Sequence, residues 1–81
     1  MWELVGVRFN SFTDQKTGQV VEGYKCYFAR AMSESEGIET RQDYINMTKY
    51  QSFGIKLILG HKYFIGNDRY GRIDAIMDCT D

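Results

Sequence analysis

The stretch KLILGHKYFIGNDRYGRIDAIMDC, residues 56–79, contains two apolar runs joined by a short polar turn. In the second run, apolar side chains occupy alternate positions, namely Ile73, Ala75, Met77 and Cys79. Alternation of this kind is the period of a half-buried β-strand. Ile76 interrupts it, as a residue covered from both sides does. The stretch therefore predicts a β-hairpin that contributes apolar residues to the core.

The turn of this hairpin, NDRYG at residues 67–71, carries more than turn chemistry requires. Asn, Asp and Gly are sufficient to build a tight turn. Tyr70 adds a large ring that gains little in an exposed loop unless it packs or binds something. Arg69 and Arg72 flank the ring, and an arginine can both stack on an aromatic surface and pair with phosphate. Tyr70 either folds back over the sheet or forms a contact surface.

Three further strands are predicted at residues 2–12, 19–32 and 38–47, and residues 48–56 are expected to form a loop or a single helical turn. In the first strand we expect a bend at Gly6. One face is predicted to hold Val5, Val7 and Phe9, and the other Leu4, Arg8 and Asn10.

The second predicted strand is long and contains Gly23, which suggests a strand that is coiled or bulged at that position. Beyond the glycine, one face carries Tyr24, Cys26 and Phe28, and the other carries Lys25, Tyr27 and Ala29. Both faces therefore have aromatic side chains, and one of them is expected to line the core.

Five strands without a long helix in 81 residues predict an all-β protein with a single domain, residues 1–81. We expect a small closed or nearly closed β-barrel, because closure removes exposed strand edges. A core this small buries a limited share of its surface, so a homodimer interface is a natural supplement.

The composition narrows the class of protein. No apolar run reaches the ~20 residues of a membrane helix, and the N-terminus lacks the order of a signal peptide, so a cytoplasmic protein without membrane contact is expected. Cys26 and Cys79 are interpreted as buried thiols, since free cysteine is among the most buried residue types.

Catalytic chemistry has little support in the sequence. His61 is the single histidine and has no acid next to it in the sequence, and the two cysteines lack ligand-like spacing. Glycine-rich phosphate-binding motifs are absent as well. We therefore expect no enzyme activity, no metal and no cofactor.

Aromatic residues are interleaved with cations along the chain, at Tyr24–Lys25, Tyr27–Arg30, Lys49–Tyr50, Lys62–Tyr63 and Arg69–Tyr70–Arg72. This combination is typical of single-stranded nucleic-acid binding, in which bases stack on rings and cations follow the phosphates. The formal net charge of −1 counts against it, but acids are grouped in the stretch SESEGIE and near the C-terminus. A basic face can exist under a neutral total.

The order of these features resembles the small helix-destabilising, single-stranded-DNA-binding proteins of filamentous phages and their relatives on conjugative elements of Gram-positive bacteria. The similarity rests on two strands around a Lys-containing loop, then EGYKCYF, then a hairpin ending NDRYGRIDAI. It implies a five-stranded OB-like barrel with a protruding C-terminal hairpin, which forms two-fold dimers and coats single strands. Residues 33–53 have no counterpart in this layout.

The resemblance also implies roles for individual residues. Tyr24 and Lys25 are expected on the DNA-facing side of the second strand, with Lys16 in the preceding loop. Arg69 and Tyr70 are expected at the hairpin tip, near the DNA channel of a partner subunit. The remaining expected phosphate contacts are Arg8 and Arg72.

Two functions remain open from the sequence. The first is sequence-independent binding of single-stranded DNA, or RNA, by a protein of a phage or mobile element. The second is a small β-barrel protein–protein interaction or assembly module, because tyrosine and arginine are also enriched at protein interfaces.

Overall fold

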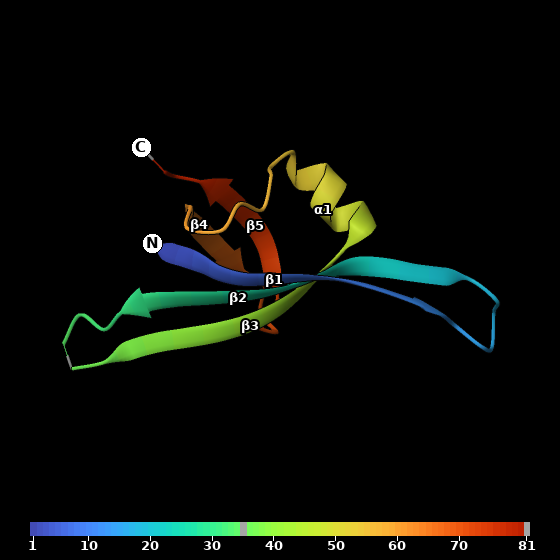
Figure 1. Cartoon of the computed structure of the whole chain (residues 1–81), viewed down its shortest axis with the longest axis horizontal. Coiled ribbons are helices and arrows are strands. Elements are labelled where there is room, and N and C mark those ends of the chain that lie inside the picture. The colour runs from blue at the N-terminus through green and yellow to red at the C-terminus, as the bar shows by residue number, and fades with distance from the viewer. Residues whose placement is uncertain (35, 81) are drawn as a thin grey trace.

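The computed structural model describes residues 1–34 and 36–80. The elements in this part of the chain are β1 (Trp2–Thr13), β2 (Val20–Ala31), β3 (Ile38–Asn46), α1 (Met47–Phe53), β4 (Lys62–Asn67) and β5 (Ile73–Asp78). The strands pair antiparallel in one sheet of order β3-β2-β1-β4-β5 (Figure 1). The prediction of a mostly β protein with five strands is confirmed, and α1 forms where a loop or helical turn was expected.

The predicted closure of the sheet into a barrel is wrong. β3 and β5 are the two edges of the sheet and do not pair with each other. Closure would require a backbone ladder between them, but β5 has only six residues and its pairing with β4 is irregular near the turn. Hydrogen bonds from the Arg41 side chain of β3 to the β4–β5 turn cross the gap instead.

The hairpin that projects from the body is also different from the one expected. Figure 1 shows the β1–β2 ribbon extending well past α1, whereas β4 and β5 fold over the rest of the sheet. The molecule is accordingly elongated, with principal extents of 47 × 24 × 24 Å.

The core lies between the three-stranded part of the sheet and the β4–β5 hairpin. Its buried residues are Trp2, Leu4, Cys26, Phe28, Ile45, Tyr63, Ile65, Ile73 and Ile76. The rings of Phe28 and Tyr63 meet edge to face at a centroid distance of 6.2 Å, which joins the two layers. The Tyr63 hydroxyl accepts from the Ile58 N–H and donates to the Lys56 carbonyl, so the loop before β4 is held by a core residue.

Two register shifts decide which side chains enter this core. One shift lies between Leu4 and Gly6 of β1, so Leu4 faces the core together with Val7, and the predicted grouping of Val5 with Val7 is wrong. A single extra residue in a strand turns all following side chains to the other face.

The second shift follows the same rule in the C-terminal hairpin. β4 and β5 lose register between Gly66 and Asn67, opposite Asp74. Ile73 and Ile76 are therefore buried, while Met77 is 61 % exposed. Ile76, which interrupted the alternation in the sequence, is a core residue, and the predicted face with Ala75 and Met77 is wrong.

Gly23 does not form the bulge that the sequence suggested, since β2 remains in register there with Asn10 on one side and Asn46 on the other. Its role is close approach. A Cβ atom on this residue would lie 2.5 Å from the Ile45 carbonyl oxygen and 2.5 Å from the Tyr44 hydroxyl. The Tyr44 ring covers the glycine from the neighbouring strand, which only a residue without a side chain permits.

α1 is short and is defined by its two ends. The Asn46 side chain accepts a hydrogen bond from the Lys49 N–H at 2.7 Å, which is an N-cap. Gly54 ends the helix with a positive φ of 66°. The helix places Tyr50 against Tyr24, with ring centroids 4.9 Å apart, and so covers the core where β4 and β5 do not reach.

A substitution at Gly23 should test the close approach of β2 and β3. Gly23→Ala is expected to lower the free energy of unfolding by about 1–3 kcal/mol, since backbone must move to admit the Cβ atom. Asn10→Ala, at the paired position of β1, is the control and should cost less than about 0.5 kcal/mol. Urea denaturation measures both, and equal losses would contradict the steric account.

His61 and Asp78 form a partly exposed pair, with the His61 Nδ1 atom 2.7 Å from the Asp78 Oδ2 atom. Hydrogen bonds from His61 and from Thr80 lower the pKa of the Asp78 carboxyl from 3.8 to about 2. The pair joins the loop before β4 to the end of β5. Its stabilising contribution is therefore complete above the ordinary carboxyl pKa and is lost as the pH falls through the lowered value.

Acid unfolding should reveal the contribution of the His61–Asp78 pair to stability. Between pH 4 and pH 2 the wild-type Tm is expected to fall more steeply than that of Asp78→Asn, because the variant has no carboxyl to protonate at this position. Asp74→Asn, an exposed position on the same strand, is the control and should retain the wild-type slope. Circular dichroism at several pH values measures the slopes, and parallel curves for wild type and Asp78→Asn would refute this assignment.

Candidate nucleic-acid interface

The turn between β4 and β5 is built by one aspartate. The Asp68 Oδ1 atom accepts from the backbone N–H groups of Tyr70 at 2.8 Å and Arg72 at 3.0 Å. Its own N–H donates to the Arg72 carbonyl, and Gly71 adopts a positive φ of 79°. The Arg72 N–H bond is the main reason that the pKa of the Asp68 carboxyl is lowered. The carboxylate thus fixes the backbone on both sides of Tyr70.

The turn presents an aromatic ring between two cations. Tyr70 is 68 % exposed, so its ring is not folded back over the sheet. The guanidinium carbons of Arg69 and Arg72 each lie 5.2 Å from the ring centroid, within the range of a cation–π contact. Arg69, Tyr70 and Arg72 are called the tip cluster below, and the structure brings these three predicted residues together.

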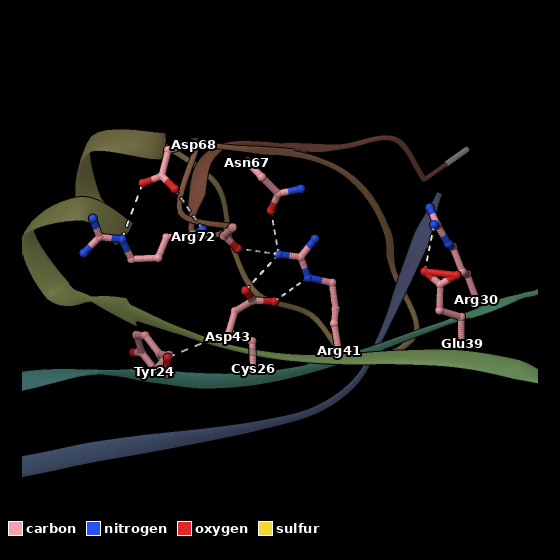
Figure 2. A network of polar contacts seen from close by, with 10 residues as sticks. Tyr24, Cys26, Arg30, Glu39, Arg41, Asp43, Asn67, Asp68 and Arg72 are labelled. Atoms are coloured by element: carbon pink, nitrogen blue, oxygen red, sulfur yellow. Dashed lines mark hydrogen bonds and ion pairs between the residues drawn. The ribbon is translucent and has the colours of Figure 1, made fainter.

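Arg41 anchors the turn to β3. Its Nε and Nη2 atoms donate to both carboxylate oxygens of Asp43, at 2.7 and 2.9 Å, and Nη2 also donates to the Asn67 Oδ1 atom at 2.6 Å and to the Gly71 carbonyl (Figure 2). The side chains of Arg41 and Asp43 are only 17 % and 9 % exposed. The two ends of the turn are therefore attached to a partly buried ion pair, which holds the tip cluster in place.

Trp2 lies beneath this ion pair. The guanidinium carbon of Arg30 is 4.1 Å from the Trp2 ring centroid and that of Arg41 is 5.5 Å from it. Arg30 is itself paired with Glu39 at 2.8 Å. An open groove of about 370 Å³ runs here between β3 and the turn, and its lining includes Trp2, Arg41 and Asn67.

A second set of candidate residues lies on the outer face of β1, β2 and β3, opposite the core. Arg8 pairs with Lys25, and Lys25 pairs with Tyr44, so the three form one row across the three strands. Tyr27 shares this face, and the Lys25 Nζ atom lies 5.7 Å from its ring centroid. Arg8, Lys25, Tyr27 and Tyr44 are called the outer-face cluster.

The outer face is depleted of acid. Neighbouring residues of a strand point to opposite faces, so the buried residues show which positions face outward. The outward positions are residues 3, 6, 8, 10 and 12 of β1, the odd-numbered residues of β2 and the even-numbered residues of β3. Glu3 is the one acid among these described positions. Glu22, Glu39 and Asp43 face the other way. A net charge of −1 therefore coexists with a weakly basic sheet face.

Two predicted residues lie apart from both clusters. Tyr24 cannot share a face with Lys25, because adjacent strand residues point to opposite sides; its ring is packed between Phe9 and Tyr50. The expectation that Tyr24 faces the same surface as Lys25 is wrong. Lys16 is exposed in the β1–β2 loop, where its N–H donates to Asp14.

Several residues of the site were not singled out in the sequence. Tyr44 lies two strands from Arg8, and Arg41 is 26 residues from Asn67. Alternation placed Tyr27 on the face of Lys25, but Tyr27 was not among the expected contact residues. Lys49 of α1 is close enough to Asp68 to contribute to the lowering of its carboxyl pKa, which adds a cation beside the tip cluster.

Within residues 1–34 and 36–80, no three His, Cys, Asp or Glu side chains gather in a way that could hold a metal ion. Among the helices described, none is long and apolar enough to cross a membrane. Comparison of the chain with protein-family models, with curated proteins and with solved structures finds no match.

Removal of Arg41 should release the turn and expose an unpaired carboxylate. Arg41→Met keeps the aliphatic stem and is expected to lower the free energy of unfolding by about 2–4 kcal/mol, because Asp43 remains nearly buried without its partner. Arg41→Met combined with Asp43→Asn should recover about half of that loss. Urea denaturation tests this pair, and a double variant as unstable as the sum of the two singles would show that the pair is not coupled.

Proposed function

We propose that this protein binds single-stranded nucleic acid without reading its sequence. The observation that carries the proposal is the tip cluster, in which an exposed tyrosine ring lies between two guanidinium groups on a turn held by hydrogen bonds to β3. A rigid exposed ring stacks on any base at low entropic cost. The exposed Arg69 and Arg72 guanidiniums flank it as phosphate contacts, although the Arg72 Nε atom also lies 3.5 Å from the Asp68 Oδ2 atom. No base-specific hydrogen bond is required.

The outer-face cluster supports the same proposal. Arg8 and Lys25 provide two cations on a sheet face that has aromatic side chains at Tyr27 and Tyr44. Single strands are bound by grooves and faces that combine these two kinds of side chain. Duplex DNA is read by a helix or a two-stranded ribbon that enters a groove. α1 has only seven residues, with Lys49 as its one cation, and the projecting part of the β1–β2 ribbon, residues 10–23, has Lys16 as its one cation.

The topology supports an OB-like interpretation of the fold. We propose that the sheet is an OB-like barrel left open between β3 and β5, with Arg41 bridging the seam. OB-folds bind oligonucleotides on the face of strands 2 and 3 and with the loops that follow strands 1 and 4. Lys25 and Tyr44 lie on that face, Lys16 lies in the first of these loops, and the tip cluster lies in the second.

Binding to a fluorescent oligo-dT of about 20 nucleotides tests the proposal, with a duplex of equal length as the competitor. Fluorescence anisotropy should show binding of the single strand that weakens steeply between about 50 and 200 mM salt, since bound phosphates release counterions. Oligo-rU of the same length distinguishes RNA from DNA preference. Absence of binding at low salt would overturn the proposal and favour the protein-interaction module.

Tyr70→Ala should weaken binding by about 10- to 100-fold, the equivalent of one lost base stack. Tyr70→Phe keeps the ring and should remain within about 3-fold of wild type. Phe64→Ala is the matched control, because Phe64 is an exposed aromatic residue of β4 at 51 % that lies outside both clusters. If Phe64→Ala weakened binding as much as Tyr70→Ala, the tip cluster would not be the contact site.

Lys25→Ala and Arg8→Ala test the outer-face cluster separately. Each should reduce the slope of log affinity against log salt by about one, because one phosphate contact is lost. Lys56→Ala, in the loop before β4, is the control and should leave the slope unchanged. If the slopes of Arg8→Ala and Lys25→Ala were also unchanged, the interface would be restricted to the tip cluster.

A further inference from the structure

The edges of the sheet are β3, β5 and the parts of the inner strands that extend past their partners, of which the far part of β1 is the longest. β1 pairs with β4 only through Trp2 and Glu3, and Leu4 adds backbone hydrogen bonds to Gly60 and His61. From Val7 to Thr13, the hydrogen bonds of β1 in the described part of the chain go to β2 alone. The other side of this seven-residue segment carries unpaired backbone groups, which form a template for another strand.

The edges of β3 and β5 are protected in known ways. β3 carries the charged residues Arg41 and Asp43 on its inward face, and the β4–β5 turn is bonded beside it. β5 has only six residues, and its pairing with β4 is interrupted by a register shift. Inward charges, short length and bulges are the devices by which natural sheets prevent edge pairing.

The edge of β1 has none of these protections. Residues 7–13, VRFNSFT, contain no proline, no acid and no inward charge, and their pairing with β2 is regular. Apolar residues are exposed on both faces of the ribbon, with Phe9 at 50 %, Phe12 at 58 % and Val20 at 59 %. The ribbon projects from the body in Figure 1, and a two-stranded ribbon on its own is only marginally stable.

We propose that the free edge of β1 pairs antiparallel with β1 of a second copy of this chain, with Asn10 on the two-fold axis. In an antiparallel pair centred on Asn10, the positions of any two opposed residues add to twenty. Arg8 then lies opposite the Phe12 of the other copy, Phe9 opposite Ser11, and Val7 opposite Thr13. The centre at Asn10 pairs the whole of residues 7–13, which no other centre does.

This register is self-complementary, and that favours a second copy as the partner. No two like charges are opposed, and each Arg8 guanidinium meets a Phe12 ring across the axis on the outer face, which is a favourable cross-strand pair. A centre at Arg8 would oppose two guanidiniums. Isologous pairing also joins the two ribbons into one four-stranded sheet, whose apolar faces are then shared by both copies.

Disulfide trapping tests the register in the absence of nucleic acid, so its outcome is independent of the proposed function. Asn10→Cys is made in a Cys79→Ser background. The second native thiol, Cys26, is buried, which raises its pKa to about 12 and leaves it unreactive. Residues opposed on the axis lie near disulfide distance, so oxidation should convert most of the protein to a cross-linked dimer. Gln42→Cys, exposed at the middle of the β3 edge, is the matched control and should remain largely monomeric on a non-reducing gel.

A charge exchange across the axis provides the second test. Phe12→Lys opposes two cations in the dimer and should weaken self-association at least tenfold in sedimentation equilibrium. Adding Arg8→Glu to that variant restores an attractive pair and should recover most of the loss. A monomeric wild type at about 100 μM would overturn the proposal, as would Gln42→Cys cross-linking as well as Asn10→Cys or a double variant weaker than Phe12→Lys alone.

Discussion

The bond network of the Arg41 guanidinium is the constraint on which the arrangement of this molecule depends. One side chain of β3 binds Asp43 in its own strand, Asn67 and Gly71 in the β4–β5 turn, and covers Trp2 from β1. β3 is thereby joined to two parts of the chain with which it shares no backbone ladder. A lysine could not do this, because its ammonium has neither the planar fork that binds a carboxylate through two parallel N–H bonds nor a flat face to lie over the Trp2 ring. Hydrogen bonds from this one side chain therefore bridge the gap between β3 and the β4–β5 turn, where the strands do not pair.

Charge separation between the two sides of the sheet explains how a slightly acidic chain can present one weakly basic face. The acids of β2 and β3 lie on the core side, where Glu39 and Asp43 are consumed by ion pairs with Arg30 and Arg41. On the outer face, no acid lies opposite Arg8 or Lys25 on the neighbouring strands of the described chain. Net charge is therefore a poor guide for a small sheet protein, because strand alternation can sort the charges by face.

The sequence was sufficient to predict the strands but not the faces that they present. Alternation and turn residues located all five strands, yet the extra residues at Val5 and Asp74 reverse the side-chain direction midway. Gly6 and Ile76 indicated an irregularity near these positions, but not the residue at which the face changes. The tip cluster was predictable because its three residues are adjacent along the chain. The Arg41 bridge and the row from Arg8 to Tyr44 were not, since both depend on pairing between distant segments.

The proposed self-pairing of β1 and the proposed binding of single-stranded nucleic acid are coupled through the geometry of the sheet. Arg8 belongs to the outer-face cluster and also lies on the free edge of β1, so pairing about Asn10 brings two acid-depleted faces together as one surface. A nucleic-acid strand that is long enough to span that surface contacts both copies. Once it has bound one copy, its contact with the second copy is intramolecular. Nucleic acid that binds the pair more tightly than the single copy must stabilise the pair by the same free energy. Self-association and binding should therefore strengthen each other.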